Sequence, residues 1–147
     1  NTRFIELAGE INTSMPDYVI QKIIFALNRE GKNLKNTRIL LLGLAYKKDV
    51  DDNRESVTFK IMEFLEENGA VVDFNDPHIP KVLPTRKYQQ FIGKKSVPLE
   101  EVEQYDLTVI LTDHTSYDYE LIVKRSKIIV DTRNSCGKIK SSKIIRA

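Results

Sequence analysis

The amino-acid sequence predicts an α/β fold: a Rossmann-like, doubly wound, mainly parallel sheet that is preceded by one long helix. Two observations support this fold class. Residues 37–43 form a near-continuous apolar run, which is typical of a strand buried on both faces of a parallel sheet. Short strands of this kind alternate along the chain with segments of helical period, as they do in open α/β sheets.

Size and charge limit the classes of function. The chain has 147 residues, enough for one domain with a sizeable core, and its formal net charge is +2. So small a charge does not favour nucleic acid or an anionic membrane as a partner. No apolar stretch approaches the roughly 18 residues of a membrane span. The single cysteine, Cys136, excludes a disulfide within the chain and fits a reducing compartment, so we expect a cytoplasmic protein.

The first expected element is a helix over residues 4–29. Pro16 lies inside it, and because proline removes a backbone donor and clashes with the preceding turn, we expect Pro16 to kink the helix or divide it. Gly31 supplies a stop signal. The apolar positions of the helix recur at steps of three and four residues, and they are Ile5, Ala8, Ile11, Met15, Val19, Ile23 and Leu27.

A strand–helix–strand unit follows this helix. The apolar run 37–43 is its first strand, and a polar loop leads to Ser56, the expected N-cap of a helix over 57–68 that Gly69 ends. Residues 70–74 form the second strand, which Asn75-Asp76-Pro77 terminates. The default geometry of such a unit is a right-handed crossover between parallel strands.

The remaining elements are shorter. We expect loops over 78–95, which could include a short strand at 88–92, and a short helix over 99–104. Residues 106–112 and 127–131 are further buried strands, with a helix over 117–126 between them. The lysine-rich tail from Lys138 to Arg146 is expected to be a solvated, frayed terminus, because chain ends usually are.

Ligands of open α/β sheets bind outside the carboxyl ends of the strands. Segments 45–48, 112–114 and 131–134 follow such ends, so we expect Lys47 and Arg133 near one edge of the sheet. An ammonium and a guanidinium group there suit an anionic ligand, above all a diphosphate. Gly43 stands alone before Tyr46, without a G-x-G-x-x-G loop, so a dinucleotide is not expected at the first strand. No spacing typical of a zinc site is present either.

The segment Gly-Leu-Ala-Tyr-Lys-Lys-Asp-Val-Asp-Asp-Asn-Arg-Glu-Ser at 43–56 resembles the motif that opens the C-terminal domain of the UDP-glucose and GDP-mannose dehydrogenase family. Asp76-Pro77, Leu-Thr-Asp-His at 111–114 and Asp-Thr-Arg-Asn at 131–134 fall in the family's order. Residues 3–12 resemble the end of its central dimerisation helix. The sequence is most similar to the branch that acts on UDP-N-acetylglucosamine or UDP-N-acetylmannosamine, and both sugars stay open.

The resemblance implies a division of the chain and of the chemistry. Residues 1–33 would be the C-terminal part of the central dimerisation helix and 34–147 the UDP-sugar-binding domain, with the N-terminal NAD domain absent from the chain. Enzymes of this family oxidise the sugar C6 alcohol to a carboxylate for polysaccharide precursors, in two NAD-dependent steps through an upstream cysteine. The resemblance therefore implies a homodimer through the N-terminal helix, NAD only in the full-length parent, and neither cofactor nor catalytic residue in this fragment.

Four residues acquire roles from the resemblance. Tyr46 and Lys47 would contact the nucleotide sugar, and Arg133 would contact the substrate or its diphosphate. Arg3 resembles an arginine that reaches the substrate of the neighbouring subunit. Without the resemblance, Lys47 and Arg133 would be interpreted as surface residues and Arg3 as a solvated residue of a first turn.

Other polar residues have structural interpretations. We expect Asp52 and Arg54 to form an ion pair that orders the loop, and Cys136 to be an ordinary residue. Asp113 and His114 could serve as a base or as metal ligands, although loop contacts are the commoner role of such residues. Two rival functions follow: a non-catalytic Rossmann-like module for dimerisation or regulation, and a stand-alone nucleotide-binding enzyme that uses Cys136 or His114.

Overall fold

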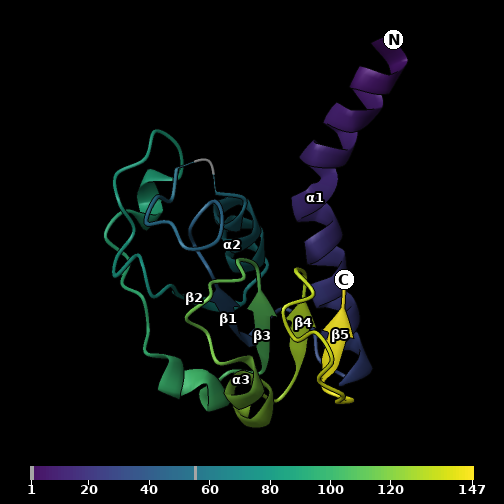
Figure 1. The fold of residues 1–147 in the computed structure, drawn as a ribbon, viewed down its shortest axis with the longest axis vertical. Helices are drawn as coiled ribbons and strands as arrows, with labels where there is room; N and C mark the ends of the chain where they lie inside the picture. The colour runs from purple at the N-terminus through teal and green to yellow at the C-terminus, as the bar shows by residue number, and fades with distance from the viewer. Residues whose placement is uncertain (1, 55) are drawn as a thin grey trace.

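The computed structural model describes the backbone of residues 2–54 and 56–147 and the side chains of residues 15–54 and 56–147. It contains a five-stranded sheet whose strands all run parallel, in the order β2-β1-β3-β4-β5 (Figure 1). The strands are β1 (Arg38–Leu42), β2 (Val71–Asn75), β3 (Leu107–Ile110), β4 (Ile129–Asp131) and β5 (Ile144–Arg146). The expected doubly wound α/β fold is confirmed.

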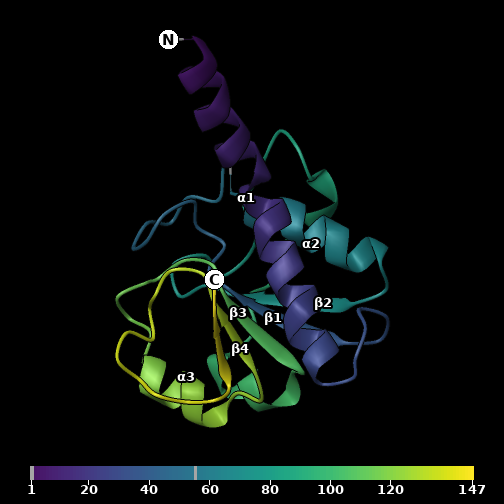
Figure 2. The same ribbon diagram turned by 90° about the vertical axis from the view of Figure 1, so that its right-hand side faces the viewer.

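Helices cover both faces of this sheet. The long helix α1 (Thr2–Arg29) and α2 (Thr58–Glu67) pack on one face, while α3 (Tyr119–Arg125) and the 3₁₀ helix η2 (Leu99–Gln104) lie on the other (Figure 2). A second 3₁₀ turn, η1 (Gln89–Phe91), lies in the long connection between β2 and β3. This arrangement explains why residues 39–42 of β1 and 107–110 of β3 are all buried and, apart from Thr108, all apolar.

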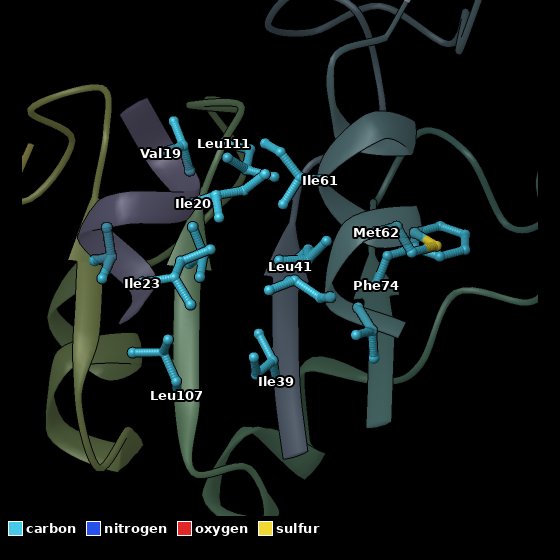
Figure 3. Close-up of a cluster of buried hydrophobic side chains, with 14 of the residues drawn as sticks. Val19, Ile20, Ile23, Ile39, Leu41, Ile61, Met62, Phe74, Leu107 and Leu111 are labelled. Carbon is cyan, nitrogen blue, oxygen red and sulfur yellow. The ribbon is translucent and has the colours of Figure 1, made fainter. Parts of the chain in front are cut away.

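Strand β1 shows the double burial most clearly. Ile39 and Leu41 join the cluster under α1 and α2, Leu40 and Leu42 join the cluster under α3, and all four are completely buried. Each fully buried side chain of this size contributes about 1.5–3 kcal/mol. Figure 3 shows the first cluster, in which the β1 side chains meet Ile20, Ile23, Ile61 and Met62.

Helix α1 continues through Pro16, so the expected division of the helix there is not found. Proline leaves one carbonyl of the helix without its backbone donor. The apolar residues that follow, including Val19 and Ile23, pack α1 against the sheet and hold its second half in place. Lys32 N–H donates to the Leu27 carbonyl across Gly31, whose φ is 69°, which confirms the expected helix stop. No helix in the described ranges has the length and apolar character to span a bilayer.

The tail forms a strand, so the prediction of a frayed terminus is wrong. Residues Ile144–Arg146 pair in parallel with β4, and Ile145 is buried against the first core cluster. The Arg146 guanidinium donates to the Ile139 carbonyl at 2.8 Å and so holds the chain end to the preceding loop. Three residues are too few to show a strand pattern in the sequence. They are ordered because they pair with the edge that β4 leaves open.

The short strand expected at 88–92 is also wrong. Residues Gln89–Phe91 form η1, and aromatic side chains anchor this loop on α2. The Phe59 ring of α2 stacks on Tyr88 with centroids 5.6 Å apart and on Phe91 at 6.1 Å. Aromatic residues favour strands in general, but burial against a neighbouring helix satisfies them equally well.

The start of α2 closes the loop that follows β1. Thr58 Oγ1 donates to the Gly43 carbonyl at 3.0 Å, and Ser56 Oγ accepts the N–H of Thr58 at 3.2 Å. The N-cap residue itself is Val57, which has no side-chain cap hydrogen bond, so Ser56 performs the expected capping from one position earlier.

Gly43 lies where β1 and β3 leave the sheet side by side, and its φ is 104°. A Cβ atom at this position would lie 2.3 Å from Thr112 Cβ and 2.7 Å from the Thr112 backbone nitrogen. No side chain fits at such distances, and the backbone conformation itself favours glycine. The close approach of the two strand exits therefore depends on Gly43.

We predict that Gly43→Ala lowers the free energy of unfolding by about 3 kcal/mol or more, since it combines overpacking with backbone strain. Gly93→Ala is the matched control, because Gly93 has a φ of 86° and open space around it. The control should cost about 1 kcal/mol, from the backbone alone. Urea denaturation of both variants measures the difference, and equal costs would contradict the close-approach argument.

Candidate functional site

The carboxyl ends of β1, β3 and β4 lie next to one another in the sheet. The chain passes from β1 to β2 on one side of the sheet and from β3 to β4 on the other, so the order of the strands reverses between β1 and β3. Ligands of open α/β sheets bind in the crevice at such a switch point. The loops that follow β1, β3 and β4 are therefore the candidate functional site.

A buried aspartate directly after β2 organises the loop that follows β1. The Asp76 carboxylate is fully buried, and its Oδ2 accepts the N–H groups of Leu44 at 2.8 Å and Ala45 at 2.9 Å. Its Oδ1 accepts the N–H of His78 at 2.8 Å. Burial alone would raise the pKa of Asp76, but the hydrogen bonds from His114 and from these three backbone groups outweigh it and lower the pKa.

His114 lies against Asp76 and is completely buried. Its Nε2 lies 2.9 Å from Asp76 Oδ2, and its Nδ1 accepts the backbone N–H of Asp49 at 2.8 Å. An atom that accepts from an amide carries no proton, so the ring is neutral with its proton on Nε2. His114 thus makes the loop contacts that its position after β3 suggested.

Asp49 links the β1 loop to the β3 loop a second time. Its Oδ1 accepts the N–H of Thr115 at 2.7 Å, and its Oδ2 accepts from the Thr115 hydroxyl. The hydrogen bond from the Thr115 hydroxyl lowers the pKa of Asp49 most, and the one from the Thr115 amide lowers it further. Asp49 has a φ of 60°, a conformation that aspartate tolerates and that aims its N–H and its carboxylate at the same neighbouring loop.

Tyr46 and Lys47 lie at the exposed tip of this loop. The Tyr46 ring is half exposed, and Lys47 Nζ lies 5.6 Å from its centroid. Tyr46 N–H donates to the Asp52 carbonyl at 3.0 Å, which closes the loop. The expected pair of Asp52 and Arg54 is confirmed, with Arg54 Nη2 at 2.8 Å from Asp52 Oδ2, and the Arg54 side chain lowers the pKa of Asp52.

Arg133 lies on the loop after β4, which a second buried aspartate organises. The Asp131 carboxylate accepts the N–H groups of Arg133 at 3.1 Å, Ser135 at 3.0 Å and Cys136 at 2.9 Å. The Arg133 side chain is 43% exposed, and its Nε lies 3.6 Å from Asp113 Oδ1. Its backbone is thus fixed while its guanidinium faces solvent beside the loop after β3.

The structure therefore brings Tyr46, Lys47 and Arg133 to one edge of the sheet, on loops that flank the end of β3. The expectation that Lys47 and Arg133 share an edge is confirmed, while their contact with a ligand stays a prediction. The side chain of Arg3 lies outside the described residues. The sequence did not reveal the roles of Asp76 and Asn53. Asn53 is fully buried, and its side-chain amide forms hydrogen bonds with the backbone of Leu83.

These omissions have a common cause. Asp76 stands in an Asn-Asp-Pro sequence, which also signals an ordinary turn, and Asn53 stands among charged loop residues. Both side chains make contacts across about 30 or more positions of sequence, such as the 32 positions between Asp76 and Leu44. The available signal was a carboxylate directly after a buried strand, at the edge where ligands bind.

Asp49, His78 and His114 also present ligand atoms that lie within 4.8 Å of one another, as a metal site would require. His78 Nε2 is buried and has no hydrogen-bond partner within the described part of the chain. Both ring nitrogens of His114, however, are already engaged by Asp49 N–H and by Asp76. A metal ion would have to break one of these bonds, so the geometry favours loop contacts.

Cys136 is buried, and burial together with the nearby Asp131 carboxylate raises the pKa of its thiol to about 12. The thiolate is the reactive form of cysteine, so Cys136 is a poor nucleophile at neutral pH. A cavity of about 380 Å³ lies elsewhere, at the amino edge of the sheet, between the ends of α1 and α2. The switch-point edge carries the exposed cations Lys47 and Arg133.

We predict that Asp76→Asn lowers the free energy of unfolding at pH 7 by about 1–3 kcal/mol, because an amide loses the charge and turns a donor toward a backbone N–H. The pKa of Asp76 is lowered in the fold, so its stabilisation is present above the ordinary value of 3.8 and is lost as the pH falls through the lowered value. The difference in the free energy of unfolding between wild type and Asp76→Asn should therefore narrow below pH 3.8.

Urea titrations between pH 2 and 8 (roughly the span over which carboxylates and His titrate) measure this gap. Asp51→Asn, at an exposed position of the same loop, should change the free energy of unfolding by less than about 0.5 kcal/mol. A gap between wild type and Asp76→Asn that stays constant at all pH values would show that the carboxylate charge does not matter.

Comparisons with known proteins agree with this fold. The model of the UDP-glucose/GDP-mannose dehydrogenase family, UDP binding domain, matches residues 40–138. A UDP-N-acetyl-D-mannosamine dehydrogenase of Methanococcus maripaludis is 33% identical over 142 residues, which cover 91% of this chain and 31% of that protein. The chain thus spans about a third of the length of this relative.

Two solved structures extend the comparison. The UDP-D-ManNAc dehydrogenase from Pyrococcus horikoshii matches with a TM-score of 0.76 at 30% identity, covering 97% of this chain and 32% of that one. The native UDP-N-acetyl-mannosamine dehydrogenase Cap5O from Staphylococcus aureus matches with a TM-score of 0.66 at 30% identity, covering 93% and 31%. The chain therefore belongs to the UDP-glucose/GDP-mannose dehydrogenase family, and it comprises the family's UDP-binding domain.

Proposed function

We propose that this chain is the UDP-sugar-binding part of an NAD-dependent UDP-N-acetylhexosamine 6-dehydrogenase, which oxidises the sugar C6 alcohol to a carboxylate for polysaccharide precursors. The relatives support this substrate class, because they are described as dehydrogenases of UDP-N-acetylmannosamine. NAD is proposed as the cofactor of the whole enzyme. The residues of this chain would hold the nucleotide sugar, residues 1–33 belonging to the dimerisation helix and 34–147 to the binding domain.

The observation that carries the proposal is a pair of exposed cations on fixed loops at the switch point. The loop of Lys47 is held by Asp76 and that of Arg133 by Asp131, and both side chains are exposed. A diphosphate suits this pair, since a guanidinium can bind it with two parallel hydrogen bonds and an ammonium with a point charge. The half-exposed Tyr46 ring offers a flat surface for the base or the sugar.

We predict that Lys47→Ala and Arg133→Ala each weaken UDP binding to this chain about tenfold or more, because a hydrogen bond to a charged group contributes about 1.5–3 kcal/mol. Isothermal titration with UDP measures the change. Lys140→Ala removes an exposed cation from the segment before β5 and should leave the affinity within about twofold.

Equal affinity of all three variants would contradict the assignment of the phosphate contacts. A wild-type chain that binds no UDP would favour the rival function, a non-catalytic module for dimerisation or regulation. The urea stability of each variant serves as the control for folding, because weaker UDP binding reports a lost contact only when the variant keeps its fold.

The proposed homodimer rests on the exposed face of α1. Met15, Tyr18 and Phe25 expose 45%, 45% and 53% of their surface, and Lys22 Nζ lies 5.5 Å and 6.0 Å from the rings of Tyr18 and Phe25. At 100° per residue these four positions share one side of the helix, away from the buried side. Such a stripe fits a second copy of the helix, and Arg3 is proposed to reach the substrate of that copy.

We predict that Phe25→Glu shifts the chain from dimer to monomer in sedimentation velocity, because it buries a charge in the helix pair. Ile24→Glu is the matched control: Ile24 is 43% exposed but lies on another side of α1. A monomeric wild type, or an equal shift by both variants, would contradict a dimer through this stripe.

A further inference from the structure

We propose that the buried pair of Asp76 and His114 positions the tip of the substrate loop, residues 46–48, by holding the backbone on both sides of it. The effect of this pair on UDP binding rests on the function proposed above. Its effect on the order of the loop is independent of that function, since the pair acts through hydrogen bonds to the backbone within the chain.

The hydrogen bonds surround the tip. Before it, Asp76 Oδ2 accepts the N–H groups of Leu44 at 2.8 Å and Ala45 at 2.9 Å. After it, His114 Nδ1 accepts the N–H of Asp49 at 2.8 Å. The two acceptors are joined to each other, since His114 Nε2 lies 2.9 Å from Asp76 Oδ2. One buried unit thus holds both ends of a three-residue segment whose own side chains are exposed.

The chemistry of the ring makes His114 the specific link. Nδ1 must be an acceptor, because Asp49 offers an N–H, and Nε2 must be a donor, because Asp76 offers a carboxylate oxygen. Only the neutral ring with its proton on Nε2 meets both demands. The imidazole therefore presents an acceptor to the far end of the tip, while Asp76 holds the near end directly.

The conformation of Asp49 supports a functional demand for this link. Its φ of 60° is uncommon for a residue other than glycine, and such conformations persist when the surroundings determine them. Here the surroundings are His114, which receives the Asp49 N–H, and Thr115, whose N–H and hydroxyl meet the Asp49 carboxylate. Both partners lie on the loop after β3, so the tip is tied across the switch point.

A tip held at both ends loses little freedom when a ligand binds. Ordering of a mobile loop weakens binding, and a loop that is ordered beforehand avoids that loss. Lys47 lies at the centre of the tip and would contact the diphosphate through a long, flexible side chain. The Asp76–His114 pair thus acts on the ligand through Lys47 and Tyr46, and His114 is a positioning residue that does not touch the ligand.

Two variants of His114 separate its two bonds. The amide of His114→Asn reaches the position of Nδ1 and can still accept the N–H of Asp49. The amide of His114→Gln reaches the position of Nε2 and can still donate to Asp76, but it offers nothing to Asp49. Ser116→Ala, at an exposed position of the same loop, is the neutral control. Backbone order parameters of residues 46–48 and a titration with UDP are measured for all four proteins.

We expect order parameters of about 0.85 over 46–48 in wild type, His114→Asn and Ser116→Ala, and values below about 0.6 in His114→Gln. UDP affinity should fall about tenfold in His114→Gln and stay within about threefold in His114→Asn, which corresponds to the loss and the retention of one hydrogen bond. In wild type, the ring nitrogen NMR signals of His114 should show an unprotonated Nδ1 and a protonated Nε2.

Three results would overturn the inference: a proton on Nδ1 in wild type, unchanged order of residues 46–48 in His114→Gln, or equal loss of order in both His114 variants. The ring nitrogen signals of His114 are measured on the wild-type protein alone, so they test the inference even if His114→Gln fails to fold. A wild-type chain that binds no UDP would refute the proposed function alone, because the order of residues 46–48 is measured without ligand.

Discussion

The candidate site depends on one interaction, the burial of the Asp76 carboxylate among hydrogen-bond donors. A buried charge costs several kcal/mol unless hydrogen bonds satisfy it. The donors of Asp76 come from three separate segments: the exit of β1 at Leu44 and Ala45, the turn at His78, and the loop after β3 at His114. All three segments must be in place together, so the carboxylate couples the exits of β1, β2 and β3.

The same interaction distinguishes this loop from the nucleotide-binding loop of a dinucleotide fold. In a Rossmann fold the amides at the exit of the first strand and at the start of the next helix receive a pyrophosphate. Here the amides of Leu44 and Ala45 donate to Asp76, and the first amide of α2, at Thr58, donates to Ser56. The backbone is satisfied internally, and exposed side chains are left to face a ligand.

Asp131 repeats the principle at the end of β4. Its carboxylate gathers the N–H groups of Arg133, Ser135 and Cys136, just as Asp76 gathers those at the exit of β1. In both cases a buried anion fixes the backbone of a loop whose cation remains exposed. The arrangement reconciles the two demands that ligand binding would place on such a loop, a defined backbone and an accessible charge, because each demand falls on a different residue.

The sequence by itself determined the layers of the fold and the edge where the candidate site lies. Continuous apolar runs such as 37–43 predict doubly buried parallel strands, and the strand ends then predict the positions of Lys47 and Arg133. Only the tertiary structure decided that the tail forms β5, that α1 continues through Pro16, and that Asp76 and His114 hold the β1 loop. Periodicity reports the burial of neighbours along the chain, whereas these features arise from groups many positions apart, which meet only when the sheet has assembled.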